Sequence, residues 1–319
     1  DTEASDAEKL FQIETLTVNA WKRHGPIDAV VSLDGDSDRP LMLGVEPVRD
    51  PGSDTPCRVK FFGGDLLGMV VADYLKVDAV VVPVSCNDAV DRGPLKDVLE
   101  PKTRIGSPFV IAGMQRAVAA GCQAVCGWEA NGGFLLGSNL ERNEKVLAAL
   151  PTRDAFLPII AVLLRAKEEN VRVSELFDAL PRRFSRADLL KNFPRDVSER
   201  IIHRLTLAGS NNQLIDFAGA IAPALLEIQA EVARFFTPGQ GFGSVEKMDY
   251  TDGVRIYFSN GDVAHVRPSG NADELRIYAV ADSQSRADDI ANQSVAEPDG
   301  ILRRLEAAVT CDRANPDRR

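Results

Sequence analysis

The chain has 319 residues, of which 45% are hydrophobic and 26% charged, a composition typical of a globular protein with about two or three domains. Its net charge of −10 and the lack of a basic stripe exclude nucleic acid as a partner. No apolar run is long enough to cross a bilayer, and the acidic N-terminal residues do not resemble a signal peptide, so we expect a cytoplasmic protein that does not act at a membrane.

A helix is predicted at the start of the chain, with Gly25 at its end, followed by a buried strand over residues 29–33. A second short strand is predicted over residues 41–45, and the Pro and Gly residues between 47 and 56 indicate a linker. A helix and so few strands do not make a complete sheet domain. We therefore expect the chain to begin part-way through a domain.

The aspartate loop, residues 34–39, joins these strands and has the sequence DGDSDR. Asp34, Asp36 and Asp38 alternate in it, and carboxylates so close together repel one another unless a cation holds them. Oxygen ligands at this spacing suit a hard ion such as Mg2+. We expect the preceding strand to belong to a parallel sheet, because ligands in open α/β folds bind where such strands end. An EF-hand loop is excluded by Val45, which stands where its bidentate Glu is required, whereas a solvated acidic turn remains as an alternative.

The middle of the chain alternates predicted strands and helices, which is βαβ organisation and implies a parallel sheet. The predicted strands are residues 79–84 and 124–127, and the predicted helices are residues 65–74, 108–120, 155–167 and 174–180. Within this region lies the Glu129 loop, residues 127–133 with the sequence GWEANGG. Glu129 and Asn131 offer an acceptor and an amide at alternate positions, which suits the vicinal hydroxyls of a sugar. An ordinary glycine-rich turn is the alternative.

The last region is predicted to be α+β with an antiparallel sheet. A hairpin is expected from residues 254–258 and 263–266, because Asn260 and Gly261 between them are a strong turn signal. A further strand is predicted over residues 274–280, with helices over residues 198–205, 222–235 and 301–309.

The Arg267 loop, residues 267–276, follows the hairpin and has the sequence RPSGNADELR. Guanidinium groups, a hydroxyl and backbone amides of this kind suit one phosphate group. The candidate phosphate ligands are Arg267, Ser269, the backbone amides of Gly270 and Asn271, and Arg276. The alternative is a surface loop that carries two ordinary arginines.

Together and in this order, the three loops resemble those of the α-D-phosphohexomutase superfamily of phosphomannomutases and phosphoglucomutases. The family has four domains, with a phosphoserine loop, a DGDxDR metal loop, a GExSGH sugar loop and an RPSGTEP phosphate loop in turn. The resemblance implies that residues 1–57 are the C-terminal part of domain 2, that residues 58–192 are domain 3, an α/β domain, and that residues 193–319 are domain 4. The expected fold class is therefore multi-domain α/β, with mixed or parallel sheets flanked by helices, plus a C-terminal α+β domain with an antiparallel sheet.

The resemblance also implies the activity of a phosphomannomutase-like phosphohexomutase. Such an isomerase interconverts the 1-phosphate and 6-phosphate of mannose or glucose through a phosphoserine and a bisphosphate intermediate. The implied cofactor is Mg2+, held by Asp34, Asp36 and Asp38, with Arg39 as the catalytic residue beside the phosphoryl group. The implied sugar ligands are Glu129 and Asn131, and the implied phosphate ligands are Arg104, Arg267, Ser269, Gly270, Asn271 and Arg276.

The sequence departs from the family pattern in several places. The Glu129 loop has Asn131 for the family's Ser and Gly133 for its His, and the Arg267 loop has NAD where TEP is usual. More importantly, no Ser-His pair occurs, so we expect the serine loop to be missing together with the first domain and most of the second. The chain alone is then expected to be inactive.

Two further hypotheses remain open at this stage. One is a non-catalytic module that binds sugar phosphates. The other is a Mg2+-dependent phosphatase with a nucleophilic aspartate, because Asp34 and Asp36 have the spacing of the catalytic pair of such enzymes. The phosphatase hypothesis leaves Arg39 and the two distant loops without a role.

Overall fold

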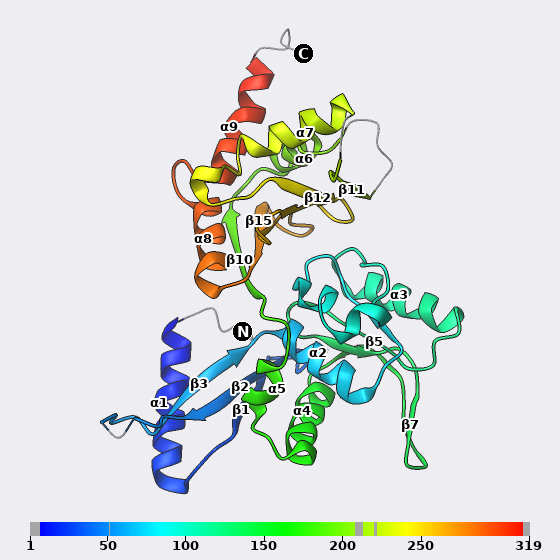
Figure 1. The fold of residues 1–319 in the computed structure, drawn as a ribbon, viewed down its shortest axis with the longest axis vertical. Helices are drawn as coiled ribbons and strands as arrows, with labels where there is room; N and C mark the ends of the chain where they lie inside the picture. The colour runs from blue at the N-terminus through cyan, green and yellow to red at the C-terminus, as the bar shows by residue number, and fades with distance from the viewer. Residues whose placement is uncertain (1–6, 51, 208–212, 220–221, 315–319) are drawn as a thin grey trace. The chain divides into compact units, whose positions relative to one another are not determined.

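A computed structural model describes residues 7–50, 52–207, 213–219 and 222–314 of the chain (Figure 1). The chain forms two compact units, which divide between Pro181 and Arg182. None of the helices in these described residues combines the length and the hydropathy needed to cross a bilayer. The cytoplasmic location stays a prediction.

The first unit begins with a three-stranded sheet of order β1-β2-β3, in which both pairs are antiparallel. Its strands are β1 (Ala29–Leu33), β2 (Pro40–Pro47) and β3 (Cys57–Phe62). Helix α1 (Ala7–His24) lies along β3 (Figure 1), and its apolar side chains pack with Leu41 and Leu43 on one face of the sheet. The aspartate loop is therefore the tight connection of a β-hairpin, and the expectation of a parallel strand before it was wrong.

The opposite face of this sheet joins the main core of the first unit. Phe62 stacks on Phe177 with ring centroids 3.7 Å apart, and Met42 belongs to the same cluster of buried side chains. Because β3 pairs with β2, residues 57–62 belong to the sheet that carries the aspartate loop. The domain boundaries stay predictions.

A four-stranded sheet of order β4-β5-β6-β9 forms the rest of the first unit, with β4 parallel to β5 and the other pairs antiparallel. Side chains alternate between its faces, so that Val81 and Leu135 pack with α3 while Val80 and Phe134 pack with the core of α2 and α4. The strands are β4 (Ala79–Val81), β5 (Val125–Trp128), β6 (Phe134–Leu136) and β9 (Leu150–Asp154), and β7 (Leu140–Arg142) and β8 (Lys145–Leu147) form a separate hairpin. The helices are α2 (Gly64–Leu75), α3 (Ser107–Ala119), α4 (Phe156–Glu169) and α5 (Val173–Asp178), with short 3-10 turns η1 (Asp88–Asp91) and η2 (Pro94–Val98).

The second unit is built on a six-stranded antiparallel sheet of order β10-β15-β14-β13-β12-β11. One face carries apolar residues such as Ile256, Ala264 and Ile277, which form the core with the helices of this unit, and α8 lies beside β10 (Figure 1). The strands are β10 (Phe184–Lys191), β11 (Leu214–Asp216), β12 (Val245–Asp249), β13 (Val254–Phe258), β14 (Val263–Pro268) and β15 (Glu274–Ala281). The helices are α6 (Arg195–Arg204), α7 (Pro223–Ala233), α8 (Gln284–Val295) and α9 (Ile301–Ala314), with a 3-10 turn η3 (Pro238–Gln240).

The predicted fold class is confirmed, with a parallel pair and flanking helices in the first unit and an antiparallel sheet in the second. The predicted hairpin is formed by β13 and β14, and Gly261 in its turn has φ +85°, which glycine adopts without strain. Strands β3 and β6 to β12 and helix α8 were not predicted from the sequence. Strands β7 and β8 have three residues each and are mostly exposed, so they lack an apolar period, whereas β6 is buried but too short, at three residues, to show one.

Candidate functional site

The aspartate loop brings three carboxylates together. Oxygen atoms of Asp34, Asp36 and Asp38 all lie within 4.8 Å of one another, and the side chains are buried, exposed and half-buried in that order. The backbone N–H of Ser37 donates to the carbonyl of Asp34 at 3.1 Å, and Ser37 has φ +60°. This tight turn brings the carboxylates of the three alternate aspartates close together.

Asp34 is the most strongly held of the three. Its Oδ1 accepts from the backbone N–H groups of Asp38 and Arg39 at 3.1 and 3.0 Å, and its Oδ2 accepts from Nε of Arg39 at 2.6 Å. Burial by itself would raise the pKa of Asp34, but the hydrogen bonds and charge of Arg39 outweigh burial and lower that pKa to about 2. Asp34 is therefore ionised at neutral pH, and it orients the guanidinium of Arg39.

Asp38 is held less completely. Its Oδ2 forms an ion pair with Nη2 of Arg153, while its Oδ1 is buried, lies 3.5 Å from Nε of Arg39 and has no hydrogen-bond partner in the described part of the chain. Burial raises the pKa of Asp38, and the charges of Asp34 and Asp36 act in the same direction, while the charge of Arg153 opposes them. Three adjacent carboxylates, one with an unsatisfied buried oxygen, fit a hard divalent cation.

The Glu129 loop is shaped by its own backbone. The N–H of Glu129 donates to the carbonyl of Gly133 at 3.0 Å, and the N–H of Gly132 donates to the carbonyl of Glu129 at 2.9 Å. Oδ1 of Asn131 accepts from the N–H of Gly133 at 3.0 Å, so this oxygen already serves the turn. The predicted role of Asn131 in sugar binding stays a prediction.

Glu129 itself is buried and has two side-chain partners. Its Oε2 accepts from Oγ of Ser107 at 2.8 Å, and the same oxygen lies 3.6 Å from Nη1 of Arg153. Ser107 is the first residue of α3. Glu129 is therefore fixed in one orientation by the start of a helix and by an arginine from β9.

Close backbone contacts place the Glu129 loop next to the aspartate loop. A Cβ atom at Gly64 would lie 2.1 Å from the backbone N of Gly132, and one at Gly132 would lie 3.3 Å from Cδ of Pro40, the residue after the aspartate loop. Only a residue without a side chain allows α2 to start so close to the Glu129 loop.

Arg153 is the residue that the sequence analysis missed in this unit. It contacts Asp38 with one Nη atom and Glu129 with the other, so it connects the aspartate loop with the Glu129 loop. The arginine lies within β9 and belongs to no recognisable motif, so its position could be found only from the fold. Arg104, by contrast, is exposed and lies over the ring of Phe109, with Cζ 5.1 Å from the centroid.

The Arg267 loop lies at the end of the β14–β15 hairpin in the second unit. Arg267 and Arg276 face each other across these strands in the register of the sheet. Ser269 is buried, and Gly270 and Asn271 are exposed, with no hydrogen-bond partner for their backbone N–H groups among the described residues. These two N–H groups are available to an anion.

The two arginines of this loop are each paired with a carboxylate. Nη2 of Arg276 donates to Oε2 of Glu274 at 2.8 Å. Burial lowers the pKa of Arg276, but the hydrogen bonds to Glu274 and Tyr278 and the electrostatic attraction of these two groups together outweigh burial and raise that pKa. Nε of Arg267 lies 3.1 Å from Oδ1 of Asp252, a second residue that the sequence analysis missed. Asp252 precedes Gly253, which has φ +80°, and a Cβ at Gly253 would lie 3.1 Å from Cα of Arg267.

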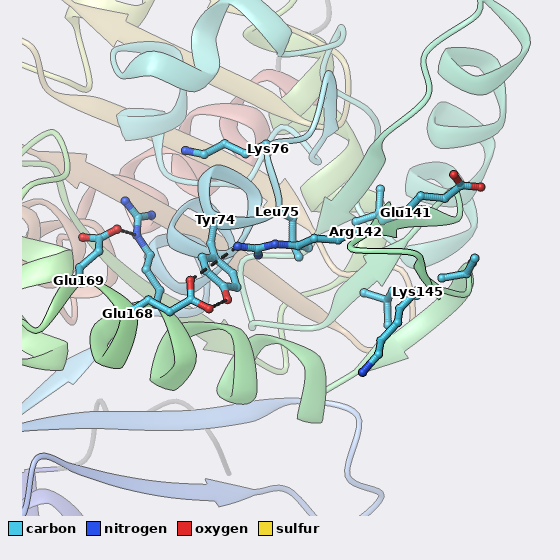
Figure 2. Close-up of a pocket in the computed structure, with 12 residues that line it drawn as sticks. Tyr74, Leu75, Lys76, Glu141, Arg142, Lys145, Glu168 and Glu169 are labelled. Atoms are coloured by element: carbon cyan, nitrogen blue, oxygen red, sulfur yellow. Dashed lines mark hydrogen bonds and ion pairs between the residues drawn. The ribbon is translucent and has the colours of Figure 1, made fainter.

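A hollow of about 610 Å3 lies elsewhere in the first unit and shares no lining residue with the three loops. Figure 2 shows Tyr74, Arg142 and Glu168 meeting at its wall. The hydroxyl of Tyr74 donates to Glu168 at 3.0 Å, and Cζ of Arg142 lies 5.0 Å from the centroid of the Tyr74 ring. These polar groups therefore interact with one another at the wall of the hollow. The hollow itself was not predicted from the sequence.

Two family models match the chain. Residues 63–184 match the alpha/beta/alpha domain III of phosphoglucomutase/phosphomannomutase, and residues 219–297 match the C-terminal domain of the same proteins. Among the curated proteins, the chain is 37% identical over 284 residues to a phosphomannomutase of Salmonella muenchen and 35% identical over 294 residues to one of Sinorhizobium fredii. These matches cover 88% and 91% of this chain and 51% and 54% of the relatives, so the chain spans about half the length of the curated relatives it matches.

Among solved structures, the fold is similar to that of an N-acetylphosphoglucosamine mutase from Aspergillus fumigatus in complex with GlcNAc-6P and magnesium. The TM-score is 0.51 at 17% sequence identity, and the match covers 88% of this chain and 52% of that one. At this identity the likeness shows the shared fold.

Proposed function

Because the chain belongs to the phosphoglucomutase/phosphomannomutase family, we propose that it serves in a phosphohexomutase, which interconverts the 1-phosphate and 6-phosphate of a hexose. The two phosphomannomutase relatives support mannose phosphate as a substrate, with glucose phosphate as the second candidate. The observation that carries the proposal is the contact of one guanidinium, that of Arg153, with both Asp38 and Glu129. It links a cation site and a group suited to sugar hydroxyls within one compact unit.

Asp34, Asp36 and Asp38 are proposed to hold Mg2+. The spacing of their oxygens and the unsatisfied Oδ1 of Asp38 support this assignment, as does the magnesium bound by the Aspergillus fumigatus enzyme. When bound, the ion neutralises negative charge on a phosphoryl group in transfer. Arg39, oriented by its hydrogen bond to Asp34, is proposed to donate to the same phosphoryl oxygens.

The remaining predicted residues are proposed to bind the substrate. Glu129, held by Ser107, would accept hydrogen bonds from sugar hydroxyls, with Asn131 beside it. In the second unit, a substrate phosphate is proposed to lie against the free N–H groups of the Arg267 loop, where guanidinium groups add charge-assisted hydrogen bonds. The proposed phosphate ligands in this loop are Arg267, Ser269, Gly270, Asn271 and Arg276. Arg104, in the first unit, is a separate proposed phosphate ligand.

The proposed reaction passes through a phosphoserine and a hexose bisphosphate. The phosphoserine gives its phosphoryl group to one end of the hexose phosphate, and the other phosphate of the bisphosphate then returns to the serine. The sequence contains no counterpart of the family's serine loop, so we expect the 319-residue chain alone not to complete this cycle. The domain limits at residues 57 and 192 form part of the same proposal.

The test is an isomerase assay of the intact gene product with mannose 1-phosphate or glucose 1-phosphate, Mg2+ and a trace of hexose bisphosphate. We expect the 6-phosphate to form, and we expect Arg39→Met to lower kcat by at least about a hundredfold, because it removes a donor to the transferring group. Arg142→Met, which removes an arginine at the hollow in Figure 2, is the control and should retain activity. Absence of isomerisation with both sugars would overturn the proposal, and binding of hexose phosphate without turnover would instead favour a non-catalytic binding module.

A further inference from the structure

Arg153 is placed so that two carboxylates share one guanidinium. Its Nη2 contacts Oδ2 of Asp38, and its Nη1 lies 3.6 Å from Oε2 of Glu129. The Arg153 side chain is 34% exposed, whereas those of Asp38 and Glu129 are 17% and 9% exposed. The arginine is therefore the more accessible member of a cluster whose acidic members are mostly buried.

The chain makes room for this arginine. A Cβ atom at Gly133 would lie 2.4 Å from Cδ and 2.9 Å from Cγ of Arg153. The aliphatic part of Arg153 thus fills the space that any side chain at position 133 would need, and it lies directly against the Glu129 loop.

The two carboxylates do not depend on Arg153 equally. Glu129 also accepts from Ser107, so it keeps a partner if the arginine leaves. Asp38 has Arg153 on one oxygen, while its second oxygen lies 3.5 Å from Nε of Arg39 and has no hydrogen-bond partner among the described residues, so Asp38 gains more than Glu129 from a further cation. A divalent ion that binds Asp38 reduces the attraction of this carboxylate for Arg153 and also repels the guanidinium.

We propose that Arg153 is a positioning residue that couples the cation site to the Glu129 loop by competing with Mg2+ for Asp38. Without Mg2+, Arg153 draws Asp38 and Glu129 together. With Mg2+ bound to the aspartates, the guanidinium shifts its interaction to Glu129 and to the anionic sugar phosphate beside it. The inference rests on the proposed function, because it takes the three aspartates as a Mg2+ site.

The coupling can be measured with Mg2+ alone, by calorimetric titration of the 319-residue chain. We expect Arg153→Met to bind Mg2+ about tenfold more tightly, since it removes a unit charge that repels a divalent ion at short range. A gain of affinity is informative, because a variant that merely disturbed the structure would bind Mg2+ less well. Arg142→Met is the matched control: it removes the same charge at a site paired with Glu168, and it should leave the Mg2+ affinity unchanged.

A double-mutant cycle tests the link to Glu129. In the wild-type chain, Glu129→Gln removes one of the two carboxylates that attract Arg153. The arginine then interacts more strongly with Asp38 and competes better with Mg2+, so the Mg2+ affinity should fall about threefold or more. In the Arg153→Met background, the same substitution should have a clearly smaller effect. Arg153→Lys keeps the charge but replaces the two Nη atoms, which contact Asp38 and Glu129 separately, by a single nitrogen, so its Mg2+ affinity should stay close to wild type while the effect of Glu129→Gln shrinks. This variant also replaces Arg153→Met in the cycle if the latter does not fold.

The outcomes separate the inference from the proposed function. Equal Mg2+ affinity of wild type and Arg153→Met, or additive effects in the cycle, would overturn the coupling while the Mg2+ site stands. A wild-type chain that binds no Mg2+ would overturn both the coupling and the proposed cation site.

Discussion

Asp252 and Arg267 form an ion pair at the base of the Arg267 loop, with Oδ1 of Asp252 3.1 Å from Nε of Arg267. Both side chains are largely shielded, with 12% and 15% exposed. The turn that carries Asp252 is also bonded to His265, whose Nε2 lies 2.6 Å from the backbone carbonyl oxygen of Asp252. The arginine proposed to bind phosphate is therefore held in place by the turn that precedes β13, the strand paired with its own.

We expect Asp252→Asn to lower the free energy of unfolding by about 1 to 2 kcal/mol, because it leaves a partly buried guanidinium without its carboxylate. Arg267→Met should lower the free energy of unfolding by less in the Asp252→Asn background than in the wild-type chain. Urea unfolding of the four proteins of this cycle measures the coupling. Asp289→Asn, an exposed aspartate on α8, is the control for loss of one charge in the second unit. Strict additivity would show that the pair does not contribute to stability.

Gly64 is expected to tolerate no side chain. Its Cβ would lie 2.1 Å from the backbone N of Gly132, and neither backbone segment can move without disturbing α2 or the Glu129 loop. Gly64→Ala should therefore lower the free energy of unfolding by about 2 kcal/mol or more. Gly35→Ala in the aspartate loop, where a Cβ would meet no atom within 4 Å, is the control and should change stability by less than about 1 kcal/mol. Similar stability of the two variants would contradict the close packing of the loops.

His265 should make the second unit sensitive to acid. Burial lowers the pKa of this histidine to about 3, and the charge of Arg255 acts in the same direction. Because Nε2 bonds a carbonyl oxygen, which can only accept, this nitrogen carries the proton of the neutral ring.

The folded pKa of His265 lies below the ordinary value of 6.5, so between these values the unfolded chain binds the extra proton and the folded chain does not. The stabilisation is complete above pH 6.5 and is lost as pH falls toward the folded pKa, with a slope of at most about 1.4 kcal/mol for each pH unit. Denaturant unfolding between pH 7 and pH 4 measures this slope, which should be smaller in His265→Gln. The exposed His203 provides the control variant His203→Gln, and an unchanged slope in His265→Gln would refute the assignment.

Mg2+ should stabilise the first unit through the aspartate loop. A ligand that binds only the folded state at 100 times its Kd adds about 2.7 kcal/mol to the free energy of unfolding. We therefore expect Mg2+ to raise the Tm of the transition in which the first unit unfolds, and we expect this Tm to return to its starting value after chelation.

Asp36→Asn tests whether this effect comes from the aspartate loop. The substitution removes one of the three proposed ligands and should therefore remove the Mg2+ effect. Because Asp36 is exposed, the stability in metal-free buffer should not change. Asp54→Asn, an exposed aspartate between β2 and β3, should keep the full effect. A Tm shift that survives Asp36→Asn would place the cation elsewhere.

The sequence by itself determined the features that depend on neighbours along the chain. The alternation of Asp34, Asp36 and Asp38 predicted a cluster of carboxylates, and a five-residue stretch can bring these groups together without help from the rest of the fold. The pair Asn260–Gly261 predicted the hairpin, because its turn requires a backbone angle that glycine adopts freely. The three loops in their order also predicted the family to which the chain belongs.

Only the tertiary structure decided which distant side chains meet. Strand β1 pairs antiparallel with β2, although its apolar pattern does not distinguish a parallel from an antiparallel partner. Arg153 reaches Asp38 and Glu129 because β9 joins the sheet beside β6. Spacing along a chain fixes contacts within a turn or a helix, whereas these contacts depend on strand order and register, which arise from packing of the whole unit.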